Sequence, residues 1–486
     1  MALPTPPDVH TTPPPAPPPL SRRVALSALA VLLAAGSAKY VAAVLLGQGK
    51  PGHPLAVGTP KTLAIPTAWV RLAPDVTPAS EVTPNASQLA GAGPPLQFWH
   101  PFGPDAGAEE SAHAAIWRVC TAVTALPIAA VAIPATTSEN LLVQLGAAIA
   151  AGSAPDAVCL DRLQLPAALT AQLITNLTDH TGDRGVAAGA FYPHVWEDVT
   201  LAGHLMAVPF GADARGLWWR KDYLTEQKVN PDEGPATLDV LTRLASPPVT
   251  TPQGTEQWGY SPYVGDDHPY TLGMLFDARW YDPGTRRLTA AAPPNMETLT
   301  WYANRKDSGL PPSAIGGSSP LISGEVQALV GGHWLLGELS PTQQSLYGAA
   351  PLPSAAGRGA TTTWSSGYGI AVPFGATFPD RSWQFAAFYA GTTASLAYVG
   401  AGGRRVMPAQ PQLAANPAVR APGKLWQTFL AMLPTAWARP AMPEAAVAWS
   451  ALADAAIRVR RGDEAPTLAL QAVDTAVNGA LQRAGW

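Results

Sequence analysis

The chain has 486 residues, which is too long for one ordinary hydrophobic core and suits two lobes with additional segments. A net charge of −4 and a charged fraction of only 13% argue against a basic face, so no nucleic-acid partner is expected. The 52 prolines are concentrated in residues 1–19 and 51–95 and in loops, and those two segments need not fold.

The first part of the chain is expected to serve export rather than the fold. A proline-rich head (residues 1–20) is followed by residues 21–46, in which Arg22 and Arg23 precede an apolar stretch and resemble a twin-arginine signal. Small residues at 36–38 suit cleavage, whereas an uncleaved segment of about 23 residues can span a bilayer, so a signal and an anchor both remain open. Residues 47–95 are rich in proline, alanine and threonine and predict an extended linker, or alternatively an extra strand on the body.

From Leu96 the apolar pattern alternates between strand and helix periods. A strand to residue 102, a helix over 108–123 and a strand over 128–133 are followed by a helix carrying Leu141 to Ile149 and a strand over 157–160. This order predicts a mostly parallel sheet with right-handed crossovers. Cys120 falls on the first helix and Cys159 within the last strand, which favours two buried free thiols over the disulfide that export would permit.

The segment from residue 203 to residue 224 predicts two strands joined by a charged turn. An apolar run over 205–208 is expected to end at Pro209, a second run covers 217–219, and Lys221 begins a possible helix. Asp213 and Arg215 lie between the runs, at a strand end where ligands meet open α/β sheets. The alternative is a solvated turn with a local ion pair.

The motifs of this segment resemble a known family. Gly203 and Pro209, followed by Asp-x-Arg-x-Leu-x-Trp-x-Lys-Asp from Asp213, are similar to the crossover between lobes in the extracellular solute-binding proteins of bacterial ABC importers, with Trp219 in place of a tyrosine. These belong to the sugar-binding family that includes the maltose-binding protein. Further matches follow in family order, at residues 96–102, 141–161, 324–336, 347–353, 367–373 and 449–481.

The resemblance implies an α/β fold of the type II periplasmic-binding-protein class, with two doubly wound lobes, a hinge and a ligand cleft between them. Residues 96–210 and 347–398 are expected to form lobe I, and residues 211–346 and 399–486 lobe II. The ligand implied is a carbohydrate and the partners are ABC permease subunits. No catalysis, cofactor, metal or nucleic acid is implied, and a monomer is expected.

A sugar site needs flat aromatic rings for C–H faces and carboxylates or arginines for hydroxyls, which suits a chain with 16 tryptophans. The resemblance implies that Asp213 binds the sugar and that Trp334 and Trp449 stack on it. Arg215 either joins Asp213 or only holds it in place, and each tryptophan can instead pack in the core. His100, Phe102 and Asp161 are further candidates at strand ends, where Trp99 is expected to point into the core and His100 to reach the cleft. Trp364 and Tyr368 flank the returning strand, and Arg405 lies near Met407 and Pro408, where the resemblance implies a polar contact with the ligand.

Two other readings remain. A membrane-tethered sensor or scaffold on the same fold is the main alternative, since the front of the chain is unusual. A glycosidase needs two carboxylates at a fixed separation, and no such pair is evident. Asp266, Asp267 and His268 are adjacent loop residues, which predicts a solvated loop rather than a metal site.

Overall fold

The computed structural model describes residues 93–485, apart from 104–107, 134–138, 246–248, 251–253, 255, 262–267, 305–319, 356–362 and 443–444. The predicted head, export segment and nearly all of the linker lie outside the described residues, as do Asp266 and Asp267. No helix within the described part is long and apolar enough to cross a membrane.

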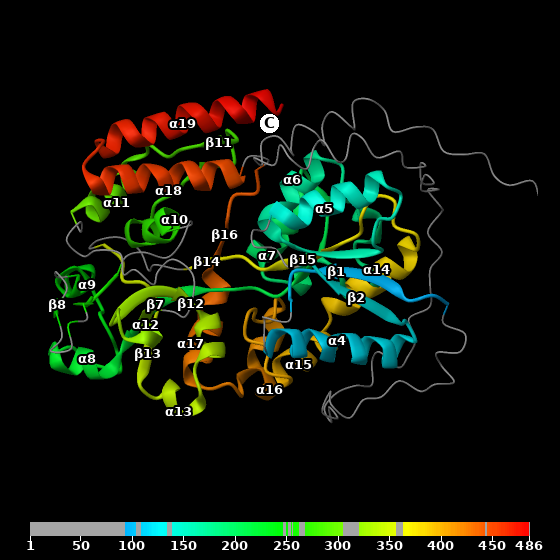
Figure 1. The fold of residues 1–486 in the computed structure, drawn as a ribbon, viewed down its shortest axis with the longest axis horizontal. Coiled ribbons are helices and arrows are strands. Elements are labelled where there is room, and N and C mark those ends of the chain that lie inside the picture. Colours follow the sequence, from blue (N-terminus) through cyan, green and yellow to red (C-terminus); the bar gives the residue numbers. More distant parts are fainter. Residues whose placement is uncertain are drawn as a thin grey trace, which may run out of the picture.

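The first lobe is built on a five-stranded mixed sheet (Figure 1). In spatial order its strands are β2 (Ile128–Ala132), β1 (Leu96–His100), β3 (Ala157–Asp161), β15 (Tyr368–Ala371) and β6 (Val208–Phe210). The first three pair in parallel, and β15 runs antiparallel to both β3 and β6. The parallel strands predicted from the alternating pattern are therefore confirmed.

Helices cover both faces of this sheet. In Figure 1, α5 (Glu139–Ala150) lies above β1 and β2, and α4 (Ala108–Thr124) lies below them. The helix α14 (Pro379–Tyr389) packs on α4 and on the sheet, and α15 (Thr392–Gly400) packs along α4. Shorter elements complete the lobe, and they are α6 (Leu165–Thr170), α7 (Pro193–Val199), α16 (Pro417–Arg420) and the hairpin of β4 (Thr200–Leu201) with β5 (His204–Leu205).

The prediction that a strand ends at Pro209 is wrong. Pro209 lies inside β6 and pairs with Gly369 of β15. Because β6 is the edge strand of the sheet, the missing N–H of a proline breaks no ladder on its outer side. The apolar run before it is divided between β5 and β6 rather than forming one strand.

The second lobe has a three-stranded antiparallel sheet. Its central strand is β7 (Arg215–Arg220), with β12 (Ala328–Gly332) on one side and β13 (Tyr347–Ala350) on the other. Two tryptophans on β7 point to opposite faces, as the period of a strand requires. Trp218 stacks on Phe429, whereas Trp219 lies so close to Gly348 that a Cβ there would be 2.3 Å from its ring.

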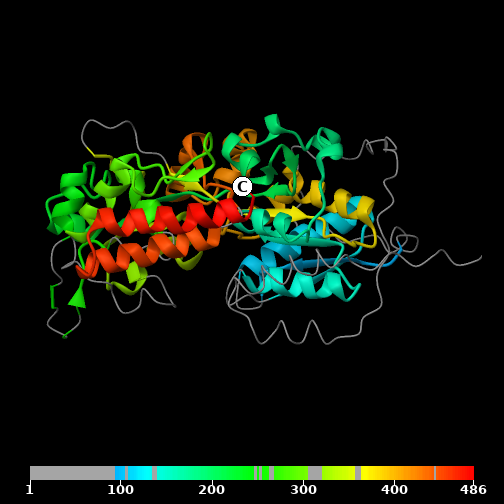
Figure 2. The same cartoon turned by 90° about the horizontal axis from the view of Figure 1, so that it is seen from above.

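Helices enclose the second sheet, and the long C-terminal pair α18 (Ala445–Arg461) and α19 (Pro466–Arg483) forms its outer layer (Figure 2). The other elements of this half are α8 (Lys221–Glu226), α9 (Leu238–Leu244), α10 (His268–Gly273), α11 (Pro293–Ala303), α12 (Pro320–Ser323), α13 (Pro341–Gln344), α17 (Lys424–Met432) and the two-residue strands β8 (Val249–Thr250), β9 (Glu256–Gln257), β10 (Tyr281–Asp282) and β11 (Arg287–Leu288). A further pair, β14 (Trp364–Ser365) with β16 (Trp437–Ala438), lies between the lobes in Figure 1.

Both predicted lobe boundaries in the second half of the chain lie too early. The strand at residue 347 is β13, which pairs with β7, so the chain returns to the first sheet only at β15. Likewise α16 packs on α15, which packs on α4 in the first lobe, although residues from 399 onward were assigned to the second. Periodicity predicts a strand or helix but carries no information on which neighbour it joins.

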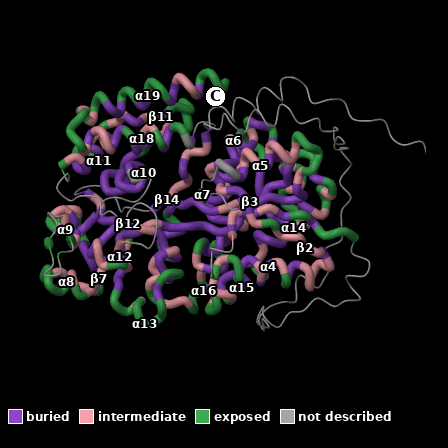
Figure 3. The backbone as a smooth tube through the Cα atoms, in the orientation of Figure 1, coloured by how far each residue is buried: buried purple, intermediate pink, exposed green. Residues whose placement is uncertain are grey.

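Buried side chains run through the centre of both halves (Figure 3). One cluster fills the first lobe and continues to α17, and the other fills the space between the second sheet and α18 and α19. Cys120 and Cys159 are both buried and free, which confirms the prediction of two thiols.

Candidate functional site

The two lobes are joined by three segments that lie side by side, at residues 211–214, 363–367 and 405–407. Ala212 and Met407 exchange two backbone hydrogen bonds of 2.7 Å. Asp213 donates its N–H to the carbonyl of Ser366 at 3.0 Å. The three crossings therefore form one hydrogen-bonded unit.

Glycines allow these crossings to pack at backbone distance. Gly211 has φ +70°, and a Cβ there would lie 2.4 Å from Cβ of Val406. Gly367 has φ +142°, and a Cβ there would lie 2.7 Å from the carbonyl oxygen of Gly211. A side chain at either glycine would push the crossings apart, so both positions require glycine.

Asp213 and Arg215 form an ion pair at this junction. Arg215 Nη1 donates to Asp213 Oδ1 at 2.8 Å, and the N–H of Ser366 donates to the same oxygen at 2.5 Å. Burial works against ionisation of Asp213, but the charge of Arg215 and the N–H of Ser366 outweigh it and hold the pKa of the carboxyl below its ordinary value. The solvated turn considered from the sequence is thereby excluded, since both side chains are largely buried.

Aromatic rings surround the guanidinium of Arg215. Its Cζ lies 3.2 Å from the ring centroid of Trp364 and 4.9 Å from that of Trp334. The Cζ of Arg439 lies 4.3 Å from the same ring of Trp364. Trp364 is fully buried and Trp334 is half-buried. The structure thus brings Asp213, Arg215, Trp334 and Trp364 together.

Three further predicted residues, Asp161, Tyr368 and Arg405, lie on the first-lobe side of the crossings. Asp161 ends β3 opposite Tyr368 of β15, and its Oδ1 accepts the hydroxyl of Ser366 at 3.4 Å. Tyr368 is hydrogen-bonded to the side chain of Arg405, and burial raises the pKa of its hydroxyl although Arg405 opposes the shift. Asp161 and Tyr368 therefore contact the junction through Ser366 and Arg405, respectively.

The side chains of His100 and Phe102 are buried in the first lobe and have almost no exposed surface. His100 is only 2% exposed and shares the inner face of β1 with Phe98, whereas its neighbour Trp99 is half-buried. Its Nδ1 accepts the N–H of Phe102 at 3.2 Å, and burial lowers its pKa to about 4. The expectation that His100 points outward and Trp99 inward is therefore wrong, because strand alternation places His100 with the buried residues.

Trp449 also lies in the core. It is 6% exposed on α18 and contacts Tyr270 edge-on, with ring centroids 5.1 Å apart. Tyr270 in turn meets Trp364 at 5.6 Å. Trp449 therefore supports Trp364 through one intervening ring and offers no face to a ligand in this conformation.

Two residues of the junction, Arg162 and Ser366, were not predicted from the sequence. Arg162 is 2% exposed, forms an ion pair with Asp198 at 3.0 Å, and donates to the carbonyls of Gly211 and Ser366. Burial raises the pKa of Asp198 to about 7 against the pull of Arg162. The available signals were the position of Arg162 directly after a strand-end aspartate and the Ser-Ser-Gly run before the returning strand.

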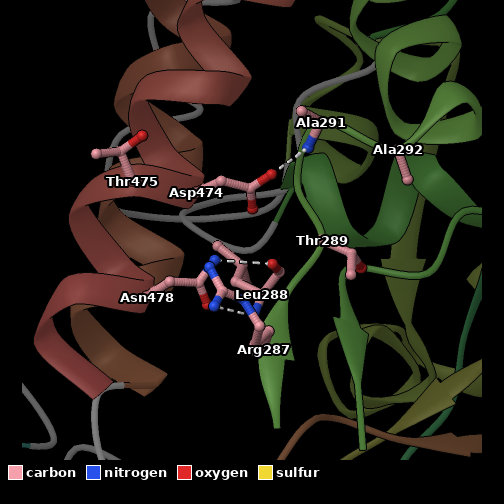
Figure 4. A pocket seen from close by; sticks show the side chains of 8 residues that line it. All are labelled: Arg287, Leu288, Thr289, Ala291, Ala292, Asp474, Thr475 and Asn478. Carbon is pink, nitrogen blue, oxygen red and sulfur yellow. Dashed lines mark hydrogen bonds between the residues drawn. The ribbon is translucent and has the colours of Figure 1, made fainter. Parts of the chain in front are cut away.

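A hollow with a volume of about 400 Å³ lies elsewhere, on the outer side of the second lobe between β11 and α19 (Figure 4). Asp474 accepts the N–H groups of Ala290 and Ala291 there, and Asn478 bonds both backbone groups of Leu288. These polar groups join α19 to the hairpin, so we regard the hollow as structural. In the described part of the chain, no group of histidine, cysteine or acidic residues could hold a metal ion.

Comparisons with known proteins agree with this architecture. The family model described as bacterial extracellular solute-binding protein matches residues 130–395. No curated protein matches the chain. Among solved structures, the cyclic alpha-maltosyl-1,6-maltose binding protein from Arthrobacter globiformis is 19% identical with a TM-score of 0.67, over 80% of this chain and 100% of that chain.

Two other solved structures are similarly related. A solute-binding protein of an ABC transporter from Thermotoga lettingae, bound with alpha-D-tagatose, is 19% identical with a TM-score of 0.67, over 80% of this chain and 100% of that chain. The sugar-binding protein MalE from Xanthomonas citri is 19% identical with a TM-score of 0.66, over 81% and 98%. These likenesses show the fold. Because the family model matches more than half of the residues, the chain belongs to the family of bacterial extracellular solute-binding proteins.

Proposed function

We propose that the protein captures a carbohydrate between its two lobes, outside the cytoplasm, and delivers it to the permease subunits of an ABC importer. The observation that carries this proposal is the convergence of Asp213, Arg215, Trp334 and Trp364 at the lobe junction. The names of the similar structures, which describe binding of a maltosyl sugar and of tagatose, point to the same class of ligand.

The chemistry of the junction suits a sugar. The indole of Trp334 is half-buried and offers apolar surface for the C–H face of a pyranose. The carboxylates of Asp161 and Asp213 accept hydrogen bonds, and Arg215 and Arg405 donate them, which covers both roles of a hydroxyl group. The ligand site we propose comprises these residues with Tyr368. Trp364 was also expected to bind the ligand, but it is fully buried, so it supports the site from the core, as do His100, Phe102 and Trp449.

A binding role needs no catalysis and no cofactor, so we expect no enzymatic activity. We further propose that residues 21–46 direct export, as a cleaved signal or as a retained anchor, and that the protein acts as a monomer. Supporting the location is the description of the family as extracellular. Release of new reducing ends from oligosaccharides by purified protein would contradict the binding role and favour a glycosidase.

The test is a thermal-shift screen against a panel of malto-oligosaccharides, manno-oligosaccharides and monosaccharides, followed by calorimetry. At least one sugar is expected to raise Tm, because a ligand that binds only the folded state stabilises it. Trp334→Ala is expected to raise Kd for that sugar by roughly 10- to 100-fold, the worth of burying an aromatic face. A panel without any shift would overturn the proposal.

A matched control separates loss of the site from loss of stability. Trp117 is also half-buried, but its indole contacts Phe98 and His100 and donates to the hydroxyl of Tyr389 within the first lobe. Trp117→Ala is expected to lower Tm and to leave Kd within about twofold, since no junction residue is changed. Equal effects of the two substitutions on Kd would sink the site assignment.

A further inference from the structure

Ser366 is the point at which the crossings and the two acidic residues meet. Its N–H donates to Asp213 Oδ1 at 2.5 Å, and its carbonyl accepts the N–H of Asp213 at 3.0 Å. Its hydroxyl donates to Asp161 Oδ1 at 3.4 Å. The residue is 4% exposed, so these contacts leave it little surface of its own. One serine therefore contacts both carboxylates.

Ser366 donates to Oδ1 of each carboxylate, and further protein groups donate to the same two side chains. Asp161 Oδ1 accepts the N–H of Leu163 at 2.9 Å as well as the serine hydroxyl. Asp213 Oδ1 accepts Arg215 and Ser366. The Asp161 side chain also accepts the N–H of Gln164 in a capping box. Within the described part of the chain, the hydrogen bonds to the Asp213 side chain all fall on Oδ1. A carboxylate offers about four acceptor positions. Asp161 is half-buried and the Asp213 side chain keeps 10% of its surface, so each retains acceptor capacity for a ligand.

Ser366 is held rigidly from the other side by Arg162. The guanidinium donates to the carbonyls of Ser366 and Gly211, and its Nε bonds Asp198 at 3.0 Å. A Cβ at Gly367 would lie 2.6 Å from Nη1 of Arg162, so only glycine lets the guanidinium approach the backbone next to Ser366. Because Arg162 itself is sealed from solvent, it acts on the protein and not on a ligand.

We propose that Ser366 is a positioning residue, which holds the carboxylates of Asp161 and Asp213 in a fixed relative position so that the pair accepts two hydroxyl groups of one ligand. This rests on the proposed function and narrows it to a ligand with at least two hydroxyl donors in reach of the pair. A site built around such acceptors rejects an analogue that lacks a hydroxyl, because an acceptor is then left unsatisfied.

The test measures Kd by calorimetry for the sugar found in the screen. Ser366→Ala removes only the hydroxyl and is expected to raise Kd about fivefold, as loss of one weak bond to a charged group. Ser366→Thr keeps the hydroxyl and is expected to restore Kd to within about twofold. Ser365→Ala is the matched control, because Ser365 is equally buried and its hydroxyl donates only to the carbonyl of Ser366, at 3.3 Å.

A double-mutant cycle separates positioning from a general structural role. In the background of Asp161→Ala, adding Ser366→Ala is expected to leave Kd unchanged, because the serine hydroxyl acts through that carboxylate. A further fivefold rise in that background, or no rise in Kd for Ser366→Ala alone, would overturn the proposal.

A measurement without ligand distinguishes failure of this inference from failure of the proposed function. If no sugar binds the unaltered protein, the proposed function fails by itself. Amide hydrogen exchange still reports on Ser366, whose N–H is expected to exchange at least about tenfold faster in Asp213→Ala, while the N–H of Ile370 on β15 stays protected. Equal exchange at Ser366 in both proteins would show that its amide does not hold Asp213.

Discussion

The substitution Gly211→Ala tests directly how closely the three segments that join the lobes pack against one another. Gly211 has φ +70°, a conformation that costs a residue with a Cβ about 1–2 kcal/mol. The new methyl group would also lie 2.4 Å from Cβ and 2.5 Å from Cγ2 of Val406, and overpacking of this kind adds about 1–3 kcal/mol. Together these effects are expected to lower the free energy of unfolding by roughly 2–5 kcal/mol.

Gly203→Ala is the control that removes the backbone contribution. Gly203 has φ +83°, and a Cβ there would meet no atom within 4 Å. Gly203→Ala is therefore expected to lower the free energy of unfolding only through the unfavourable positive φ, by about 1–2 kcal/mol. Urea unfolding followed by tryptophan fluorescence gives both values, provided that the free energy of unfolding depends on urea concentration with the same slope in the two variants.

The difference between the two variants isolates the contact with Val406. If Gly211→Ala is no more destabilising than Gly203→Ala, the crossings are not packed at backbone distance. A difference of about 1–3 kcal/mol supports the close packing of Gly211 against Val406.

Two further predictions concern buried titratable groups. Burial lowers the pKa of His100 and His333 to about 4 and that of His194 to about 3, so the folded protein binds fewer protons than the unfolded chain between these values and about 6.5. The free energy of unfolding is therefore expected to be highest above pH 6.5 and to decrease on acidification, by about 2 kcal/mol for each imidazole at pH 5. The same free energy of unfolding in urea at pH 7.5 and at pH 5 would contradict this. Burial also raises the pKa of Cys120 to about 12 and that of Cys159 well above its usual range, so iodoacetamide at pH 8 is expected to alkylate neither thiol until urea unfolds the protein, and mass spectrometry showing a labelled native chain would refute it.

Elements governed by local periodicity were predictable from the sequence. The apolar spacing over 108–123 becomes α4, and the run at 157–160 becomes β3. Lys221 does begin a helix. In each case the period of side-chain burial is set within a few residues, so no distant part of the chain was needed.

Features that depend on distant partners were not predictable in the same way. Pro209 is tolerated inside a strand only because β6 lies at the edge of the sheet, which is a property of the assembled lobe. His100 was expected to point outward because it stands at a strand end, yet it is buried on the same face of β1 as Phe98. The contact of Arg162 with Ser366 joins residues separated by 204 positions, and no local pattern indicates it.

The two ends of β7 show why burial, and not spacing, decides what a charged pair means. Arg215 pairs with Asp213 and Arg220 with Asp222, and both pairs are two residues apart. The side chains are 12% and 10% exposed in the first pair but 30% and 61% exposed in the second. A solvated pair contributes little to stability, and a pair of buried charges is often no more stabilising than apolar residues of similar size. Stability alone therefore does not explain the pair against Trp364, and the ligand site that we propose gives a reason for it.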